Sequence, residues 1–199
     1  MAGKLIRLGA MALLPLALTA CVNIGNKSKL PPTLLTLTPT AVAPAGSAAS
    51  ATAAEALMVL EPETDQTLSV LRIPVQVDGA NIAYIKKAQW VERPARLFRA
   101  LLAETLRAKG SRLILEDTQA TVPLAGSRLA GRLIAMGYDA QSKSVVVRYD
   151  AIRTGANGEV QTKRFESVIP GVKAKGEAIA PALNRAANDV AAQVAEWVG

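Results

Sequence analysis

Histidine is absent from this 199-residue sequence, and cysteine occurs only once. Without histidine the chain cannot build a Ser-His-Asp triad, a histidine general base or a histidine-ligated metal site. A single cysteine excludes an intramolecular disulfide and a CxxC metal site. Aromatic residues make up only 4% of the chain, so large apolar side chains are scarce. These absences favour a protein that acts by binding or by its location.

Sequence patterns of common catalytic sites are also missing. There is no G-x-x-x-x-G-K-[ST] phosphate loop, no G-x-S-x-G nucleophile turn, and no serine followed three residues later by lysine. The acidic residues Glu61, Glu63 and Asp65 favour a solvated turn over a cation site, and Glu116-Asp117 has the pattern of a strand end. We therefore expect no enzyme activity, no catalytic residue, no metal site and no noncovalent cofactor.

The N-terminus has the charge order of a secretory signal peptide. Lys4 and Arg7 precede an apolar run from Leu8 to Leu18, and small residues follow it. The run is too short to cross roughly 30 Å of hydrocarbon as a helix, and Pro15 would interrupt its hydrogen bonds. We predict that residues 1–20 are a signal peptide that is removed on export.

The one cysteine lies at the expected cleavage point. Leu18-Thr19-Ala20-Cys21 resembles a bacterial lipobox, in which the thiol receives diacylglycerol and the new amine receives an acyl chain such as palmitate. Such chains anchor firmly, since each buried CH₂ contributes roughly 0.8 kcal/mol. The residue after the cysteine is Val22. In enterobacterial lipoproteins an Asp at this position favours retention in the inner membrane. The absence of Asp therefore predicts an anchor in the outer membrane, facing the periplasm. The alternative is a plain signal peptide with an incidental cysteine.

Composition divides the remaining chain into two parts. Residues 21–56 comprise the lipidated end, a polar tether and an Ala/Pro-rich linker, with a weak strand signal at Leu34–Leu37. Residues 57–199 have the patterning of a single folded domain.

The folded domain is predicted to be α+β, an α/β sandwich in which a mostly antiparallel sheet is packed by two main helices. The helices are expected at about residues 94–108 and 178–198, each with apolar side chains every three or four residues. Pro74 is expected at a sheet edge or a bulge. The last three strands are separated by short turns and predict an antiparallel meander. The expected strands are 57–61, 67–77, 81–90, 112–116, 128–138, 144–153 and 160–169.

A basic stretch is the strongest candidate for a contact surface. Residues 86–112 carry eight Lys and Arg side chains against two Glu. Such a stretch suits anionic lipid headgroups, an acidic partner protein, or simply a solvated helix face. An aromatic residue beside basic ones is a common interface anchor, although it can equally belong to the core. The candidate partner- or membrane-binding residues are Tyr84, Lys86, Lys87, Trp90, Arg93, Arg96 and Arg99. Nucleic acid is not expected, because an exported, lipidated chain rarely meets any.

The order of these elements resembles the ABC-type transport auxiliary lipoproteins, the family of paraquat-inducible protein C. The resemblance covers most of the chain after the cysteine, and no single motif in it is specific. At the first strand, leucine stands where the family usually has an aromatic residue. The stretches that carry the resemblance are Leu35–Pro39, Ile82–Tyr84 with Trp90–Pro94, Leu129–Leu133 and Ala180–Trp197.

The resemblance implies an envelope lipoprotein that serves an ABC transporter of lipids or other hydrophobic molecules. Its implied partner is the MCE-domain protein of the transporter, which it would dock at the outer membrane without catalysing a reaction. A homo-oligomeric ring would suit docking around a tubular partner. Two other functions stay open. One is a periplasmic domain that carries lipid in its own cavity, and the other is a structural lipoprotein of envelope assembly.

Overall fold

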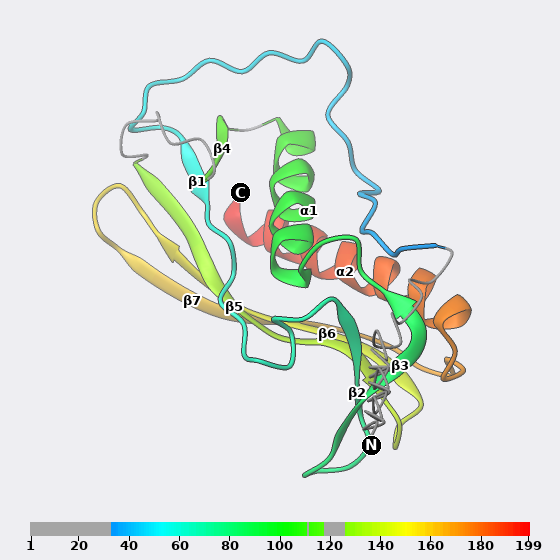
Figure 1. Ribbon diagram of the computed structural model, residues 1–199. Coiled ribbons are helices and arrows are strands. Elements are labelled where there is room, and N and C mark those ends of the chain that lie inside the picture. The colour runs from blue at the N-terminus through cyan, green and yellow to red at the C-terminus, as the bar shows by residue number, and fades with distance from the viewer. Residues whose placement is uncertain (1–32, 111, 118–125) are drawn as a thin grey trace, which may run out of the picture.

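A computed structural model describes residues 33–110, 112–117 and 126–199 of the chain. Within them, three long strands form one side of a sheet, and short strands and two helices complete the molecule (Figure 1). The elements in chain order are β1 (Leu57–Val59), β2 (Arg72–Gln76), β3 (Ile82–Gln89), α1 (Pro94–Lys109), β4 (Ile114–Glu116), β5 (Ser127–Asp139), β6 (Ser144–Thr154), β7 (Val160–Ile169) and α2 (Gly176–Val198).

The seven strands form one sheet, in which β5 is the central element. Its first residues pair in parallel with β1, which in turn pairs in parallel with β4. Its last residues pair in parallel with β2, and β2 pairs antiparallel with β3. Along its other side β5 pairs antiparallel with β6, and β6 pairs with β7. The predicted α+β class and meander are confirmed, and the short parallel pairs are an addition that the sequence pattern did not indicate.

Helix α1 begins and ends where local chemistry directs. Pro94 stands at the first turn of α1, where its missing N–H needs no partner, and Gly110 ends the helix in the left-handed conformation with a φ of 68°. The prediction for α1 is therefore correct to within one residue. The second helix begins at Gly176, two residues before the predicted start, and runs to Val198.

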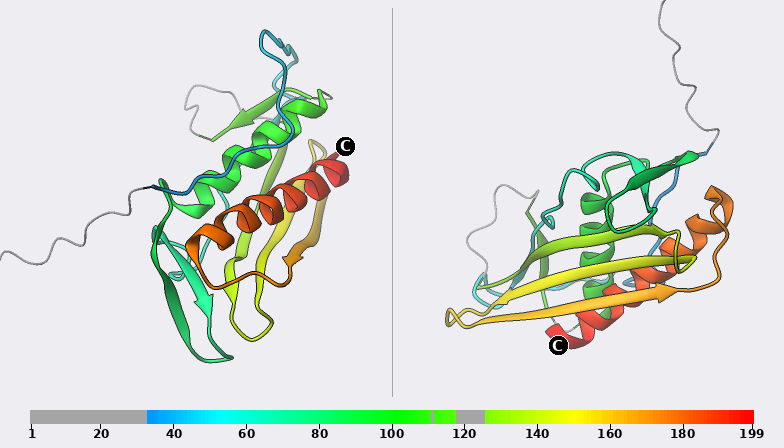
Figure 2. Two further views of the ribbon diagram at one scale, coloured as in Figure 1. Left: turned by 90° about the vertical axis from the view of Figure 1, so that its right-hand side faces the viewer. Right: turned by 90° about the horizontal axis from the view of Figure 1, so that it is seen from below.

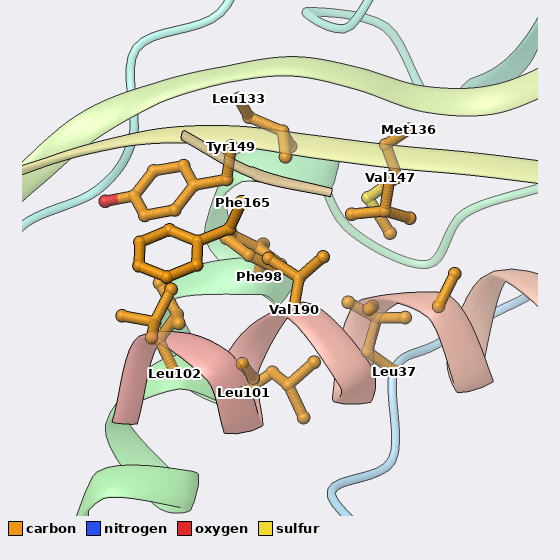
Figure 3. Close-up of a cluster of buried hydrophobic side chains, with 14 of the residues drawn as sticks. Leu37, Phe98, Leu101, Leu102, Leu133, Met136, Val147, Tyr149, Phe165 and Val190 are labelled. Carbon is orange, nitrogen blue, oxygen red and sulfur yellow. The ribbon is translucent and has the colours of Figure 1, made fainter. Parts of the chain in front are cut away.

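The two helices lie on the same face of the sheet and enclose the core (Figure 2). Alternate residues of β6, among them Val147 and Tyr149, point to this face and are fully buried. The Tyr149 ring meets Phe98 of α1 edge-on, with 5.2 Å between ring centroids (Figure 3). Val190 of α2 closes the same cluster (Figure 3). A few large side chains thus fill the layer between sheet and helices.

The opposite face of β5, β6 and β7 carries charged side chains together with the exposed Ile152, Val160 and Val168, and no helix of the described residues covers it (Figure 2). Asp150 on β6 accepts a bond from Arg164 on β7, with 2.6 Å between Oδ2 and Nη2. Arg148 pairs with Glu166 in the same two strands. Cross-strand pairs of opposite charge keep this face solvated while they help to hold the strand register.

The segment before β1 runs across both helices. As its prolines and glycines predict, residues 33–56 form no helix. The backbone N–H of Thr40 donates to Asn188 Oδ1 on α2, at 2.8 Å. That of Ala43 donates to Glu104 Oε1 on α1, at 2.9 Å. Leu37 is buried against the core (Figure 3). The linker predicted from composition therefore contacts the folded domain along part of its length.

Pro74 lies at a bulge, one of its two expected positions. The register between β2 and β3 shifts between Arg72 and Pro74, which accommodates the missing N–H. The strand itself is not at an edge, because β3 and β5 flank it. Strand β2 is also shorter than the predicted 67–77, since residues 67–71 form turns and bends.

In the described residues, no helix has the length and apolar character to cross a membrane.

We predict that Gly131→Ala destabilises the domain strongly. Gly131 has a φ of 153°, and an added Cβ would lie 2.1 Å from the Asp150 backbone oxygen. Relieving that overlap requires separation of β5 from β6, so the free energy of unfolding should fall by about 2 kcal/mol or more. Urea denaturation followed by circular dichroism measures the change.

Gly79→Ala is the matched control, because an added Cβ there meets nothing within 4 Å. Its unfolding free energy should stay within about 0.5 kcal/mol of the parent. Equal effects of the two substitutions would contradict the assigned contact between Gly131 and β6.

Candidate functional site

The predicted lipidation residue, Cys21, lies outside the described residues, so its modification stays a prediction. The structure does place the point where the preceding chain enters the domain. The Leu35 N–H donates to Gln89 O, and the Val91 N–H donates to Leu35 O, each at 2.8 Å. The tether therefore joins the domain beside the end of β3.

Five of the seven predicted contact residues reach the surface near this point. Lys86 and Lys87 are exposed on β3, and Arg93 and Arg96 are exposed at the start of α1. Tyr84 is half-buried, and the Arg72 guanidinium lies over its ring at 4.0 Å from the centroid. Whether these five residues form a contact surface stays a prediction.

Trp90 and Arg99 correct the prediction, because both are buried. Trp90 is 1% exposed: its backbone N–H donates to Leu71 O, and its side chain belongs to the core. Arg99 is 5% exposed and lies on the side of α1 that faces β4. Neither can contact a partner without unfolding of the site. Trp90 is instead the core residue that the alternative interpretation allowed.

Acidic side chains surround the arginines of α1. Arg99 Nη1 lies 2.6 Å from Asp117 Oδ1 and 3.5 Å from Glu61 Oε2. Arg107 Nη2 lies 2.7 Å from Glu116 Oε1. These acidic residues come from two stretches that the sequence suggested were a solvated turn and a strand end. The fold brings both to α1, so much of the basic charge counted in the sequence is neutralised.

The exposed arginines near the start of α1 are paired as well. The Arg93 backbone N–H and the Arg96 guanidinium hold the pKa of Glu92 below its usual value. The hydrogen bond to Glu92, with help from Glu61, raises the pKa of Arg96. On the outer sheet face, the hydrogen bond from Arg164 lowers the pKa of Asp150. All these groups keep their charge at neutral pH, as structural ion pairs do, and none is tuned for proton transfer.

The buried Tyr149 also keeps one protonation state at neutral pH. Burial raises the pKa of its hydroxyl, which donates a hydrogen bond to Ala130 O at 2.7 Å. This hydroxyl is satisfied inside the sheet and stays protonated.

Among the described residues, no group of three or more acidic or cysteine side chains could hold a metal ion. Asp65, part of the acidic cluster, instead accepts the N–H groups of Thr67 and Leu68 within its own turn.

Two features of the surface lay beyond sequence reasoning. A hollow of about 890 Å³ opens between residues 48–55 and the turn after β6, and polar groups including Arg112 and Arg153 line it. Three exposed lysines, Lys143, Lys173 and Lys175, lie in two turns far from β3 in sequence. Only the tertiary contacts of these turns reveal their neighbours, so no local pattern could have identified them.

We predict that Arg99→Met destabilises the domain by about 2 kcal/mol or more, because it leaves Glu61, Glu116 and Asp117 without their shared cation. Arg96→Met is the control, since Arg96 is exposed and its ion pairs are solvated. Chemical denaturation of both variants measures the difference. A neutral Arg99→Met would show that the buried cluster does not support the fold.

Comparisons with known proteins agree with this architecture. No curated protein matches the chain. Protein XCC0632 from Xanthomonas campestris, of family DUF330, superposes with a TM-score of 0.69 at 15% identity, over 83% of this chain and 94% of that chain. A second crystal structure, of an uncharacterized protein, gives a TM-score of 0.62 at 12% identity, over 84% of this chain and all of the other. At such identities the likeness shows a shared fold.

The sequence also identifies the family of this chain. The family model for the ABC-type transport auxiliary lipoprotein component matches residues 35–195, from the segment that pairs with the end of β3 to the last turn of α2. The match therefore includes every helix and strand described above. The chain belongs to the family of ABC-type transport auxiliary lipoprotein components.

Proposed function

We propose that this protein is a lipid-anchored, non-catalytic adaptor that docks the MCE-domain component of an ABC transport system. Diacylglycerol and an N-acyl chain on Cys21 hold it in the inner leaflet of the outer membrane, facing the periplasm. The transporter moves lipids or similar hydrophobic molecules. The family membership supports the link to an ABC transporter, and the lipobox and Val22 support the anchor.

The filled layer between sheet and helices favours the adaptor over the lipid-carrier function. A carrier needs an apolar cavity large enough to enclose much of an acyl chain. Here Phe98, Tyr149 and Val190 occupy the space between the layers (Figure 3). The hollow of about 890 Å³ lies elsewhere and is lined by charged and polar groups as well as alanines. The observed packing suits a rigid body that presents its surface to a partner.

The lipid content of the purified protein tests the choice between an adaptor and a lipid carrier. We expect native mass spectrometry of the mature chain, residues 21–199 with Cys21→Ser, to give the bare protein mass after purification from cells. A stoichiometric phospholipid adduct would favour the carrier function. The intact lipidated protein from native membranes should in contrast carry mass on the peptide that contains Cys21, and an unacylated thiol there would refute the anchor.

Membrane placement and partner choice provide the second test. After density separation of membranes, the lipidated protein should lie in the outer-membrane fraction and co-purify with an MCE-domain protein. Val22→Asp should move it to the inner-membrane fraction, and the neutral control Val22→Asn should leave it in place. Recovery with envelope-assembly proteins and without an MCE-domain protein would favour a structural lipoprotein instead.

A further inference from the structure

Lysines and arginines have different roles in this protein. Within residues 33–110, 112–117 and 126–199, every ion pair uses an arginine, and none uses a lysine. Arginine presents a planar fork that suits carboxylates, whereas the lysine ammonium is a strongly hydrated, mobile point charge. Apart from Lys163, whose Nζ lies 5.1 Å from the centroid of the Phe165 ring, the described lysines therefore supply positive charge that no carboxylate of the domain pairs with.

Five exposed lysines gather at one end of the domain. The loop before α2, which carries Lys173 and Lys175, contacts two other segments. Val172 N–H in this loop donates to the carbonyl oxygen of Lys143, at 2.9 Å. Gly176 packs so closely on β3 that an added Cβ would lie 2.9 Å from Ala88 Cβ. We call this group the lysine end; it comprises Lys86, Lys87, Lys143, Lys173 and Lys175.

Few acidic groups oppose the lysine end. Glu177 in the first turn of α2 is exposed beside it. Asp139 is close to Lys143, and its carboxylate accepts the Ser142 N–H at 2.8 Å, which lowers its pKa. Asp78, in the turn between β2 and β3, similarly accepts N–H groups of its own turn. The five ammonium groups thus outnumber the carboxylates around them.

The tether enters the domain at this same end. Leu35 pairs with Gln89 and Trp90, immediately after Lys86 and Lys87 on β3. Two views show the start of the described chain beside the end of β3 and the N-terminal turn of α2 (Figures 1 and 2). Leu34 and Val91, next to the entry point, are 44% and 51% exposed. Exposed apolar side chains near several lysines are typical of surfaces that rest on a bilayer.

We infer that the lysine end lies directly on anionic phospholipid headgroups of the membrane that holds the anchor. This inference rests on the proposed lipid anchor. The stretch from Cys21 to Thr33 spans at most about 40 Å when fully extended, so the anchor keeps the entry point close to the bilayer. Headgroup phosphates supply the negative charge that the lysines lack within the protein, and Leu34 and Val91 reach the boundary with the acyl chains.

This placement orients the whole domain. Helix α1 starts near the entry point and its C-terminal end, with Lys109, points away from it (Figure 1). The turn between β6 and β7 also lies at the far end of the sheet from the turn between β5 and β6. The far end of the domain, with the hollow beside residues 153–161, is thereby presented to the periplasm and to the docked partner.

Vesicle binding tests the inference without the acyl chains. The protein is the mature chain, residues 21–199, with Cys21→Ser. Vesicles of phosphatidylglycerol and phosphatidylethanolamine should bind it at low salt, and vesicles of phosphatidylcholine alone should not. The pair Lys173→Glu and Lys175→Glu should weaken binding tenfold or more, since each basic residue near an anionic surface contributes about fivefold in affinity. Equal binding to both vesicle types would overturn the inference.

The matched control reverses the same amount of charge elsewhere. Lys109 and Lys163 are exposed, lie away from the lysine end, and are in no ion pair among the described residues, although the Lys163 Nζ lies 5.1 Å from the centroid of the Phe165 ring. Lys109→Glu with Lys163→Glu should leave vesicle binding within about twofold of the parent. If the two double variants lose binding equally, net charge and not the lysine end drives it, and the inference fails.

The lipidated protein gives an independent readout. In proteoliposomes of the same phospholipids, Lys173 and Lys175 should be protected from acetylation relative to the detergent-solubilised protein, whereas Lys109 and Lys163 should not. Equal acetylation of all four would refute the orientation. The anchor can still be correct in that case, because the mass of the Cys21 peptide tests it separately.

Discussion

The contact between the inner face of the β5–β6–β7 meander and the two helices is the interaction on which the rest of the molecule depends. Tyr149 and Phe98 meet at its centre, and the surrounding aliphatic side chains are fully buried. Because β5 is long, it also supports β1 at one end and β2 at the other. The position of β3, and with it the entry point of the tether, follows from this arrangement.

Charge is distributed according to the same architecture. The helices cover one face of the sheet, so the other face remains in water and is crossed by pairs of arginine and carboxylate. Around α1, the arginines are matched by Glu61, Glu116 and Asp117, which arrive from separate loops and strands. The described lysines form no ion pair, and five of them are concentrated where the tether joins. A domain with this distribution is suited to lie against a membrane on one side and to meet a partner on the other.

Much of the secondary structure could be predicted from local pattern. The period-two pattern over residues 144–153 and the short turns on both sides predicted the meander, and Pro94 and Gly110 delimited α1. The parallel pairing of β1 with β5 could not be predicted, since three residues carry too little pattern to select a partner. The candidate surface was partly correct: Lys86 and Lys87 are exposed, but Trp90 and Arg99 are buried.

The sequence by itself determined the chemical inventory of this protein: the lack of histidine, the single cysteine, the two amphipathic helices and the three strands of the meander. Composition and periodicity are local properties, so they can be read without coordinates. Only the tertiary structure decided which charges cancel and which remain. Whether an arginine is buried beside a carboxylate depends on residues tens of positions away, as Arg99 with Glu61 shows.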